Sequence, residues 1–311
     1  MDLSIVIVSW NTRKLLEACL RSVYAETRGL TFEVFVVDNA SVDGSPEMVE
    51  RAFPQVRLIR NAANVGFARA SNQALRLSRG RYVLLLNPDT VILDQALVRM
   101  VHFMDQHPDI GALGPKILTA EGEVDLRCAR RFPSLLSELL ELTRLSARFP
   151  HNRLFGNYLM SYWDHNDSRE VEVLMGACLL VRREAMEQVG LLDENFYMYG
   201  EDVDWCYRLR KAGWRVWYDS QDYIIHLGSQ STKLVQEEMG LERFKSRHAL
   251  FRKHRGSLYA GAYKALMLAI TLAKQAAFWA KALMSRDKGQ RHRYQDKVRL
   301  HGQVLRWIFS P

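Results

Sequence analysis

The fold is decided by the stretch Tyr82-Val83-Leu84-Leu85-Leu86-Asn87-Pro88-Asp89. Its consecutive large apolar residues leave no polar face for water and are too few for a typical helix, so they predict a strand buried on both faces. Pro88 ends the strand because proline cannot donate to the ladder. Asp89 is thereby placed at the carboxyl end of a central parallel strand, where ligands bind in open α/β sheets. The stretch alone leaves open a second interpretation, in which Asp89 only forms a turn or caps the next helix.

Earlier in the chain, three more apolar runs alternate with amphipathic segments. The runs cover residues 5–9, 34–37 and 56–59, and helices are predicted at about 11–24, from 45 onward and at about 66–78. Such alternation predicts a doubly wound, mostly parallel sheet over about the first 120 residues. No G-x-G-x-x-G follows the first strand, which removes the main support for a dinucleotide oxidoreductase.

In the second half of the chain the pattern weakens before it returns. Between about 119 and 170 only a helix near 134–145 is predicted. The apolar run 173–181 predicts one long strand. Helices are predicted at 183–189 and 202–211, and short strands near 215–218 and 223–226.

Composition is typical of a folded protein: 48% of the 311 residues are hydrophobic and 25% are charged. The four cysteines form no C-x-x-C pair, so reduced thiols are expected rather than a disulfide framework or zinc site. Met1-Asp2 leads straight into an apolar run without a basic segment before it. We therefore expect no signal peptide and a cytoplasmic location.

The final segment, 240–311, differs from the rest in charge. It carries 16 lysines and arginines against 3 acidic residues, a net charge of +13, whereas the remainder has a net charge of −5. Such a tail suggests a polyanionic partner, with anionic lipid favoured over nucleic acid.

Lysines interrupt the hydrophobic stretch 259–284, so we expect it not to span a membrane. Instead it predicts an imperfect amphipathic helix that lies on a membrane surface or packs on the protein or on a second subunit. The polar arc of this helix contains Lys264, Thr271, Lys274, Gln275, Lys281 and Ser285. The later basic residues expected to meet lipid are Arg286, Lys288, Arg291, Arg293, Lys297 and Arg299.

Carboxylates at strand ends and helix starts are the candidate functional residues. They are Asp38, Asp89, Asp193, Glu194, Glu201, Asp202 and Asp204. Each of them can also serve as a helix cap. The aromatic cluster Phe196, Tyr197, Tyr199 and Trp205 around the later ones favours a site, because aromatic rings stack on sugars and bases. His226 ends an apolar strand before a Gly/Ser loop, where an imidazole could join Asp89 on a divalent cation.

Together these motifs resemble family 2 glycosyltransferases of the GT-A fold. The similar segments are SIVIVSWN (4–11), VVDNASVDGS (36–45), NVGFA (64–68), LNPD (86–89), GACLLV (176–181), GLLDENF (190–196), EDVD (201–204) and His226. They occur in the family's order over roughly residues 3 to 230. Within the family, the chain looks most like the rhamnosyltransferases that use dTDP-L-rhamnose to build bacterial surface polysaccharides.

On the donor side, the resemblance implies that Asp38 accepts a hydrogen bond from the N3–H of thymine or uracil. Asn39, Asp43 and Asn64 would shape the same nucleotide-sugar pocket. Asn87 and Asp89 occupy the place of the family's D-x-D motif, whose last aspartate binds Mg²⁺ or Mn²⁺ on the donor diphosphate. Asn87 departs from the strict motif, which removes one formal charge. His226 matches the family's histidine metal ligand.

On the acceptor side, the resemblance implies that Asp202 is the general base. Glu201, Asp193 and Trp205 are expected beside the acceptor. The expected organisation is a nucleotide-sugar-binding half at 1–120, an acceptor-binding and catalytic half at 121–239, and a membrane-surface tail at 240–311. The expected activity is inverting, metal-dependent transfer of L-rhamnose to a lipid-linked glycan acceptor. A UDP-hexose or UDP-galactofuranose donor, or a non-catalytic scaffold of polysaccharide assembly, are the alternatives; homo-oligomerisation is also left open.

Overall fold

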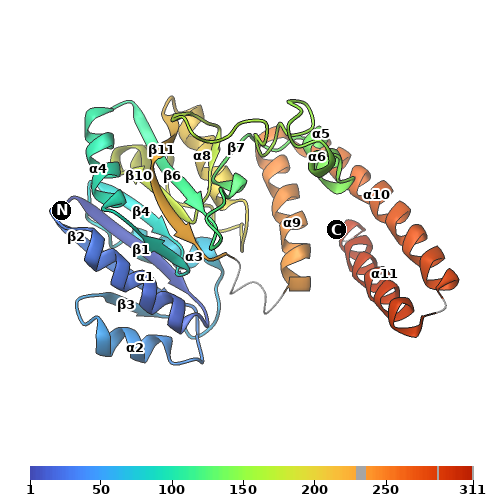
Figure 1. Ribbon diagram of the computed structural model, residues 1–311, viewed down its shortest axis with the longest axis horizontal. Coiled ribbons are helices and arrows are strands. Elements are labelled where there is room, and N and C mark those ends of the chain that lie inside the picture. The colour runs from blue at the N-terminus through green and yellow to red at the C-terminus, as the bar shows by residue number, and fades with distance from the viewer. Residues whose placement is uncertain (229–235, 286, 310–311) are drawn as a thin grey trace. The chain divides into compact units, whose positions relative to one another are not determined.

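The computed structural model describes residues 1–228, 236–285 and 287–309 (Figure 1). The chain divides into two compact units. The first contains residues 1–132 and 151–228, and the second contains residues 133–150 and the described residues from 236 onward. Each unit has its own apolar core.

A single large sheet organises the first unit. Its strands, in spatial order, are β3 (Arg57–Arg60), β2 (Phe32–Asp38), β1 (Leu3–Ser9), β4 (Tyr82–Leu86), β10 (Cys178–Arg182), β6 (Ile110–Leu118), β11 (Arg215–His226) and β5 (Thr90–Ile92), with β8 (Arg169–Glu170) also pairing with β11. From β3 to β4 all neighbours are parallel, as the alternation of strands and helices predicts. Beyond β4 the sheet is mixed, because β10 runs antiparallel to both β4 and β6.

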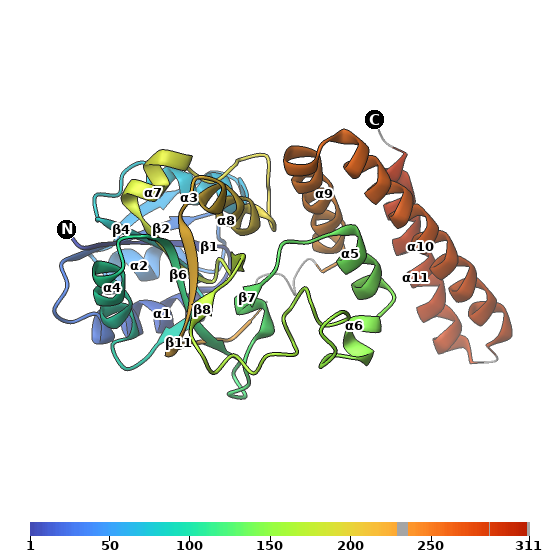
Figure 2. The same cartoon turned by 90° about the horizontal axis from the view of Figure 1, so that it is seen from above.

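Helices cover both faces of this sheet (Figure 2). On one face lie α1 (Arg13–Glu26) and α4 (Ala96–Gln106), and on the other α3 (Phe67–Leu75), α7 (Arg183–Val189) and α8 (Glu201–Lys211). A further helix, α2 (Ser45–Ala52), follows β2. All five residues of β4 are buried, so the stretch that decided the fold does lie at its centre. The α/β class with a helix-flanked central sheet is confirmed.

Two parts of the sequence-based description were wrong. The apolar run 173–181 is two strands: β9 (Val173–Leu174) pairs with β7 (Ala129–Arg130) in a small second sheet, and β10 joins the main sheet. An apolar run does not reveal a break between two sheets that are both buried. Conversely, 215–226 is one strand, β11, with irregular pairing between Asp219 and Tyr223. The sequence-based description also missed α4, β5 and β6.

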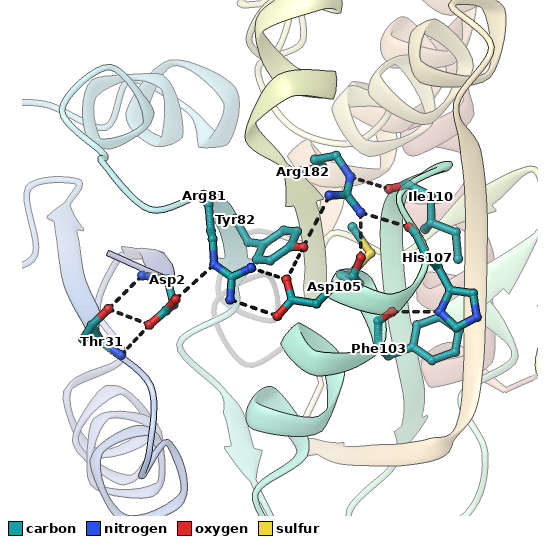
Figure 3. Close-up of polar contacts among 10 residues, drawn as sticks. Asp2, Thr31, Arg81, Tyr82, Phe103, Asp105, His107, Ile110 and Arg182 are labelled. Carbon is teal, nitrogen blue, oxygen red and sulfur yellow. Dashed lines mark hydrogen bonds and ion pairs between the residues drawn. The ribbon is translucent and has the colours of Figure 1, made fainter.

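A polar cluster joins the starts of β1 and β4, at the end of β4 remote from Asp89 (Figure 3). Arg81 forms ion pairs with Asp2 and Asp105, and the Tyr82 hydroxyl donates to Asp105 at 2.8 Å. The Arg182 guanidinium donates to carbonyls at and beyond the C-terminus of α4, including that of His107 at 2.9 Å. These contacts satisfy helix carbonyls that would otherwise lack partners.

The second unit is helical. It contains α5 (Leu135–Leu142), α6 (Leu145–Arg148), α9 (Gln236–Arg255), α10 (Ser257–Met284) and α11 (Lys288–Ile308). Ser134 begins α5 with a capping box formed with Ser137. The core of the unit includes Phe251, Tyr263, Met267, Val304 and Ile308, and Arg247 forms an ion pair with Glu138 at 2.8 Å.

Helix α10 contains the hydrophobic stretch for which an amphipathic helix was predicted. Within the described part of the chain, α10 is the helix long and apolar enough to cross a membrane, by length and composition only. The expectation that its lysines exclude a spanning length was therefore too strict. Arg286 lies outside the described residues, as do the side chains of Lys288, Arg291, Arg293 and Lys297.

Candidate functional site

The predicted donor-side residues gather at one edge of the main sheet. Asp38 is the last residue of β2 and pairs in register with Ser9, the last residue of β1. On the other side of β1, Asn87 and Asp89 follow β4. His226 ends β11, and the backbone N–H of Leu227 donates to the carbonyl of Asp89 at 2.9 Å. This is the edge at which ligands bind in open α/β sheets.

Asp38 presents an unused acceptor at this edge. The side chain is buried, and its Oδ2 accepts from the backbone N–H of Ser41 at 2.9 Å. Its Oδ1 has no hydrogen-bond partner among the described residues. A buried acceptor left without a donor costs roughly 1–3 kcal/mol, so the position favours a ligand that brings an N–H group.

The neighbouring asparagines hold the loops around Asp38. The Asn39 side-chain amide donates to the carbonyl of Gly66 at 3.3 Å, and its oxygen accepts from Asn61 at 2.9 Å. Asn64 accepts from the Gly66 backbone N–H at 3.0 Å. Asn39 and Asn64 therefore shape the pocket wall through the backbone of the β3–α3 loop.

Asp43 secures the starts of two helices. Its carboxylate accepts from the backbone N–H of Arg13, the first residue of α1, at 2.8 Å and from Ser45, the first residue of α2, at 3.1 Å. Burial opposes the ionisation of Asp43, but these hydrogen bonds outweigh it and hold the pKa of Asp43 below its usual range. The carboxylate of Asp43 therefore already accepts hydrogen bonds from backbone N–H groups of the protein.

Gly66 brings a later loop to the same pocket. The backbone N–H of Phe67 donates to the carbonyl of Tyr197 at 2.8 Å. A Cβ added to Gly66 would lie 2.5 Å from that carbonyl oxygen, and the φ of Gly66 is +85°. Only glycine allows both this φ and this short distance. The close approach of the loop that carries Tyr197 therefore explains the glycine of the NVGFA segment.

The expected metal ligands lie side by side. Oδ1 of Asp89 is 3.2 Å from Nε2 of His226, and both side chains are buried. The side-chain nitrogen of Asn87 lies 3.3 Å from the same Nε2. Nδ1 of His226 is buried without a partner among the described residues.

These distances fit a divalent cation with an incomplete protein shell. Two ligands about 2.1 Å from an octahedral ion and at right angles to each other are about 3 Å apart. The described residues include no cluster of three or more His, Cys, Asp or Glu side chains placed to hold an ion. Mg²⁺ and similar ions commonly take one or two protein ligands and complete the shell with phosphate oxygens and water. The pair Asp89–His226 could therefore hold Mg²⁺ or Mn²⁺ together with a diphosphate.

On the acceptor side, Asp202 lies in the first turn of α8. Its Oδ2 accepts from Nη2 of Arg130 at 2.7 Å and from the backbone N–H of Gly176 at 3.3 Å. Its Oδ1 accepts from the backbone N–H of Val203 at 2.8 Å. The side chains of Arg130 and Asp202 are each 13% exposed, so the carboxylate is fixed while still reachable by a substrate.

Glu201, the neighbour of Asp202, has a different environment. The residue is buried, and its Oε2 has no partner among the described residues. Burial, followed by the negative charge of Asp202, raises the pKa of Glu201 to about 8. At neutral pH the carboxyl of Glu201 is therefore mainly protonated.

Two predicted acceptor-side residues make contacts within the protein. Trp205 is fully buried and its indole N–H donates to the carbonyl of Gly190 at 2.9 Å, so it belongs to the core and cannot contact an acceptor. Asp193 accepts from the backbone N–H of Asn195 at 3.0 Å within a turn.

The remaining candidate carboxylates form ion pairs. Glu194 binds Arg69 of α3 and Arg76 just after it, and Asp204 binds Arg208 at 2.8 Å. Arg130, which lies between 119 and 170 where the sequence pattern is weak, was not predicted as a functional residue. The signal there is the run Arg127-Cys128-Ala129-Arg130-Arg131, with three arginines in five residues.

The cysteines do not supply a nucleophile. Cys19, Cys128, Cys178 and Cys206 are all free and buried. Burial raises the pKa of Cys128 to about 11 and that of Cys206 to about 12, so neither thiol ionises near neutral pH. The reduced state of these thiols stays a prediction.

Comparisons with known proteins agree with this geometry. The sequence profile of Glycosyl transferase family 2 matches residues 4–190. The chain is 33% identical over 241 residues to the N-acetylglucosaminyl-diphospho-decaprenol L-rhamnosyltransferase of Mycobacterium tuberculosis, a match that covers 74% of this chain and 77% of that protein. It is 27% identical to the low-salt glycan biosynthesis hexosyltransferase Agl10 of Haloferax volcanii, over 68% of this chain and 62% of that one.

Solved structures support the fold. The mannosyltransferase PcManGT from Pyrobaculum calidifontis, determined in complex with GDP-Man and Mn²⁺, superposes with a TM-score of 0.56 at 18% identity. The match covers 99% of this chain and 88% of that chain. The expected GT-A architecture is confirmed.

Proposed function

This chain belongs to glycosyl transferase family 2, and we propose that it transfers L-rhamnose from dTDP-L-rhamnose to a lipid-linked glycan, with inversion and with a divalent metal ion. The observation that carries the proposal is the buried, unpartnered Oδ1 of Asp38 at the same sheet edge as the pair Asp89–His226. One feature suits a pyrimidine N–H, and the other suits the ion that accompanies a diphosphate.

Recognition of the nucleotide follows from hydrogen-bond chemistry. An acceptor oxygen on Asp38 suits the N3–H of thymine or uracil, whereas cytosine has no hydrogen at N3. Asn39 and Asn64 hold the loops that enclose the base. The choice of rhamnose as the sugar is supported by the name of the Mycobacterium tuberculosis relative.

When bound, Mg²⁺ or Mn²⁺ would act as a Lewis acid that offsets the charge developing on the leaving diphosphate. Asp89 and His226 would hold it from one side. Asn87 contributes no charge there, so the site carries one negative protein ligand. The sugar is then free to develop oxocarbenium character at the anomeric carbon as the bond to the phosphate lengthens.

Asp202 would act as the general base. The acceptor hydroxyl attacks from the face opposite the leaving diphosphate and loses its proton to the Asp202 carboxylate, which yields inversion in one displacement. Arg130 and the Gly176 N–H orient that carboxylate. The protonated carboxyl of Glu201 avoids a second negative charge beside it.

The acceptor is proposed to be a prenyl diphosphate-linked sugar at the cytoplasmic face of the cell membrane. Support comes from the lipid-linked substrate in the name of the Mycobacterium tuberculosis relative and from the +13 net charge of residues 240–311, which suits anionic lipid. The enzyme would be a peripheral membrane protein of cell-wall polysaccharide synthesis.

The donor is tested with a panel of nucleotide sugars and a short-chain lipid diphosphate acceptor. We expect metal-dependent transfer from dTDP-L-rhamnose that is abolished in Asp202→Asn, while that variant still binds the donor. Turnover of a UDP-hexose or UDP-galactofuranose without turnover of dTDP-L-rhamnose would overturn the rhamnose assignment. That second candidate is kept because the Asp38 contact suits uracil as well as thymine. Full transfer by Asp202→Asn would remove the proposed base.

A further inference from the structure

Helix α10 turns an uncharged face to solvent. Its outer face, at helical spacing, is formed by Leu258, Ala265, Ala269, Leu272, Trp279 and Leu283, with alanine and glycine between them. The large members are strongly exposed: Leu258 91%, Leu272 49%, Trp279 62% and Leu283 60%. From Ser257 to Ala280 no exposed residue of α10 is charged. A continuous apolar face of this length on a protein surface marks a binding surface.

Most of the polar arc of α10 is covered by the protein, with Lys281 as the exposed exception. Thr271 is buried, and Lys264 is half-buried with its Nζ 5.6 Å from the centre of the Trp307 ring. Lys274 is also half-buried; burial, aided by repulsion from Arg144, lowers its pKa. The inward face also contains Tyr263 and Met267, so α10 is apolar on both sides. A surface helix of a water-soluble domain has one apolar stripe, which faces inward, and exposes its polar residues.

We propose that the outer face of α10 lies in the boundary between headgroups and acyl chains of an anionic bilayer, with the helix axis in the membrane plane. Basic residues flank the face at both ends. Arg252, Lys253 and Arg255 end α9 just before α10 begins, and Lys281 lies near its C-terminus. An apolar face bordered by cations is the pattern of an interfacial helix. The proposal rests on the proposed function in that a membrane-bound acceptor explains why the enzyme docks there.

An in-plane position fits better than a spanning one. The outer face extends over about 38 Å at 1.5 Å per residue, which exceeds the roughly 30 Å hydrocarbon core. Length therefore permits either arrangement. However, Val304 and Ile308 of α11 pack in one core with Tyr263 and Met267 of α10. Spanning would carry α11, with six basic residues in its sequence, and Lys264 and Lys274 into hydrocarbon.

A second copy of the chain is the other occupant to consider. In a dimer formed through the outer face, the basic flanks of two copies would come together and repel each other. An anionic surface instead pairs with those flanks. Charge complementarity therefore favours lipid over self-association.

Vesicle partitioning of the full chain tests the proposal, with Leu272→Glu/Leu283→Glu as the variant and Leu77→Glu/Leu154→Glu as the matched control. The control leucines are 54% and 57% exposed and lie in the first unit, so the chemistry of the change and the starting exposure are the same. We expect the wild type and the control to bind vesicles of phosphatidylcholine with phosphatidylglycerol equally within twofold. The outer-face variant should bind at least tenfold more weakly.

Equal binding by the two double variants, or no wild-type binding, would overturn the proposal. Sedimentation in solution tests for a dimer. If the wild type and the control are dimers and the outer-face variant is a monomer, the outer face binds a second copy of the chain. Retention of the protein on membranes through an alkaline carbonate wash would instead indicate a spanning helix.

Brominated lipid should quench wild-type tryptophan fluorescence more than that of Trp279→Phe. Transfer to a soluble acceptor without vesicles reports folding and the proposed function separately from docking.

Discussion

The guanidinium of Arg130 and the carboxylate of Asp202 lie 2.7 Å apart although 72 residues separate them in the chain. Arg130 comes from β7 of the small sheet, and Asp202 from the first turn of α8. The Gly176 N–H, at the break between β9 and β10, approaches the same oxygen. The proposed base is thus positioned by the small sheet that the sequence analysis did not foresee.

Replacement of Arg130 tests this positioning role. We expect Arg130→Gln to lower kcat about 10–100-fold, since a displacement of about 1 Å at a reacting group can cost that much. Arg130→Lys, which keeps the charge, should recover part of the loss. Donor affinity, measured by calorimetry with the nucleotide sugar, should stay within about threefold in both variants, because Arg130 contacts the proposed base on the acceptor side. A loss of donor affinity as large as the loss in kcat would contradict the assignment.

The metal site predicts a specific loss in Asp89→Ala and His226→Ala. With either ligand removed, the nucleotide should bind no more tightly in Mn²⁺ than in EDTA, whereas wild-type affinity should be at least about tenfold higher with the metal. Titration of nucleotide with and without the ion measures this. Asp94→Ala is the control, because the Asp94 side chain is exposed and its ion pair with Arg99 is long, at 3.4 Å. Wild-type metal dependence in Asp89→Ala would reject the site.

Glu201 makes the stability of the protein depend on pH. Its pKa rises from 4.5 to about 8 on folding, so the folded state binds the proton more tightly than the unfolded state. The resulting stability is fully present below about pH 4.5 and is lost as the pH rises toward 8. Glu201→Gln should therefore be more stable than wild type at pH 8, by at least about 1 kcal/mol, and should show a flatter pH dependence from 5 to 8.

Chemical denaturation across this pH range provides the measurement. Glu187→Gln serves as the control, since the Glu187 side chain is 65% exposed and its removal should leave the pH dependence unchanged. Identical pH profiles for Glu201→Gln and wild type would mean that Glu201 ionises normally in the folded protein.

Gly66 predicts a coupled loss of stability and donor binding. An alanine there adds strain at φ +85° and a Cβ 2.5 Å from the Tyr197 carbonyl oxygen, so we expect Gly66→Ala to lose about 2–4 kcal/mol of unfolding free energy. Gly29→Ala is the control that measures the cost of backbone strain alone, because Gly29 has φ +92° with nothing within 4 Å of the added Cβ. It should lose only about 1–2 kcal/mol. We expect weaker nucleotide binding in Gly66→Ala but not in Gly29→Ala. Equal unfolding free energies of the two variants would contradict the close approach of the Tyr197 carbonyl to Gly66.

Local patterns sufficed for the donor side of the site. Apolar runs that alternate with helices require parallel neighbours, and the carboxyl ends of parallel neighbours share one edge of the sheet. Asp38 and Asp89 could therefore be placed together from sequence. The acceptor side was harder to predict from sequence. Trp205 is an aromatic residue of the kind that stacks on sugars, and only its complete burial shows that it belongs to the core.

The sequence by itself determined the buried strand Tyr82–Leu86, the position of Asp89 just beyond it, and the family resemblance of the motifs. Tertiary structure alone decided that Asp89 meets His226 at 3.2 Å, that Arg130 holds Asp202, and that most of the polar arc of α10 is covered by the protein. The physical reason is the range of the interactions. Strand and helix periodicity is local, whereas ion pairs between distant segments and the choice of which helix face is covered depend on how whole elements pack.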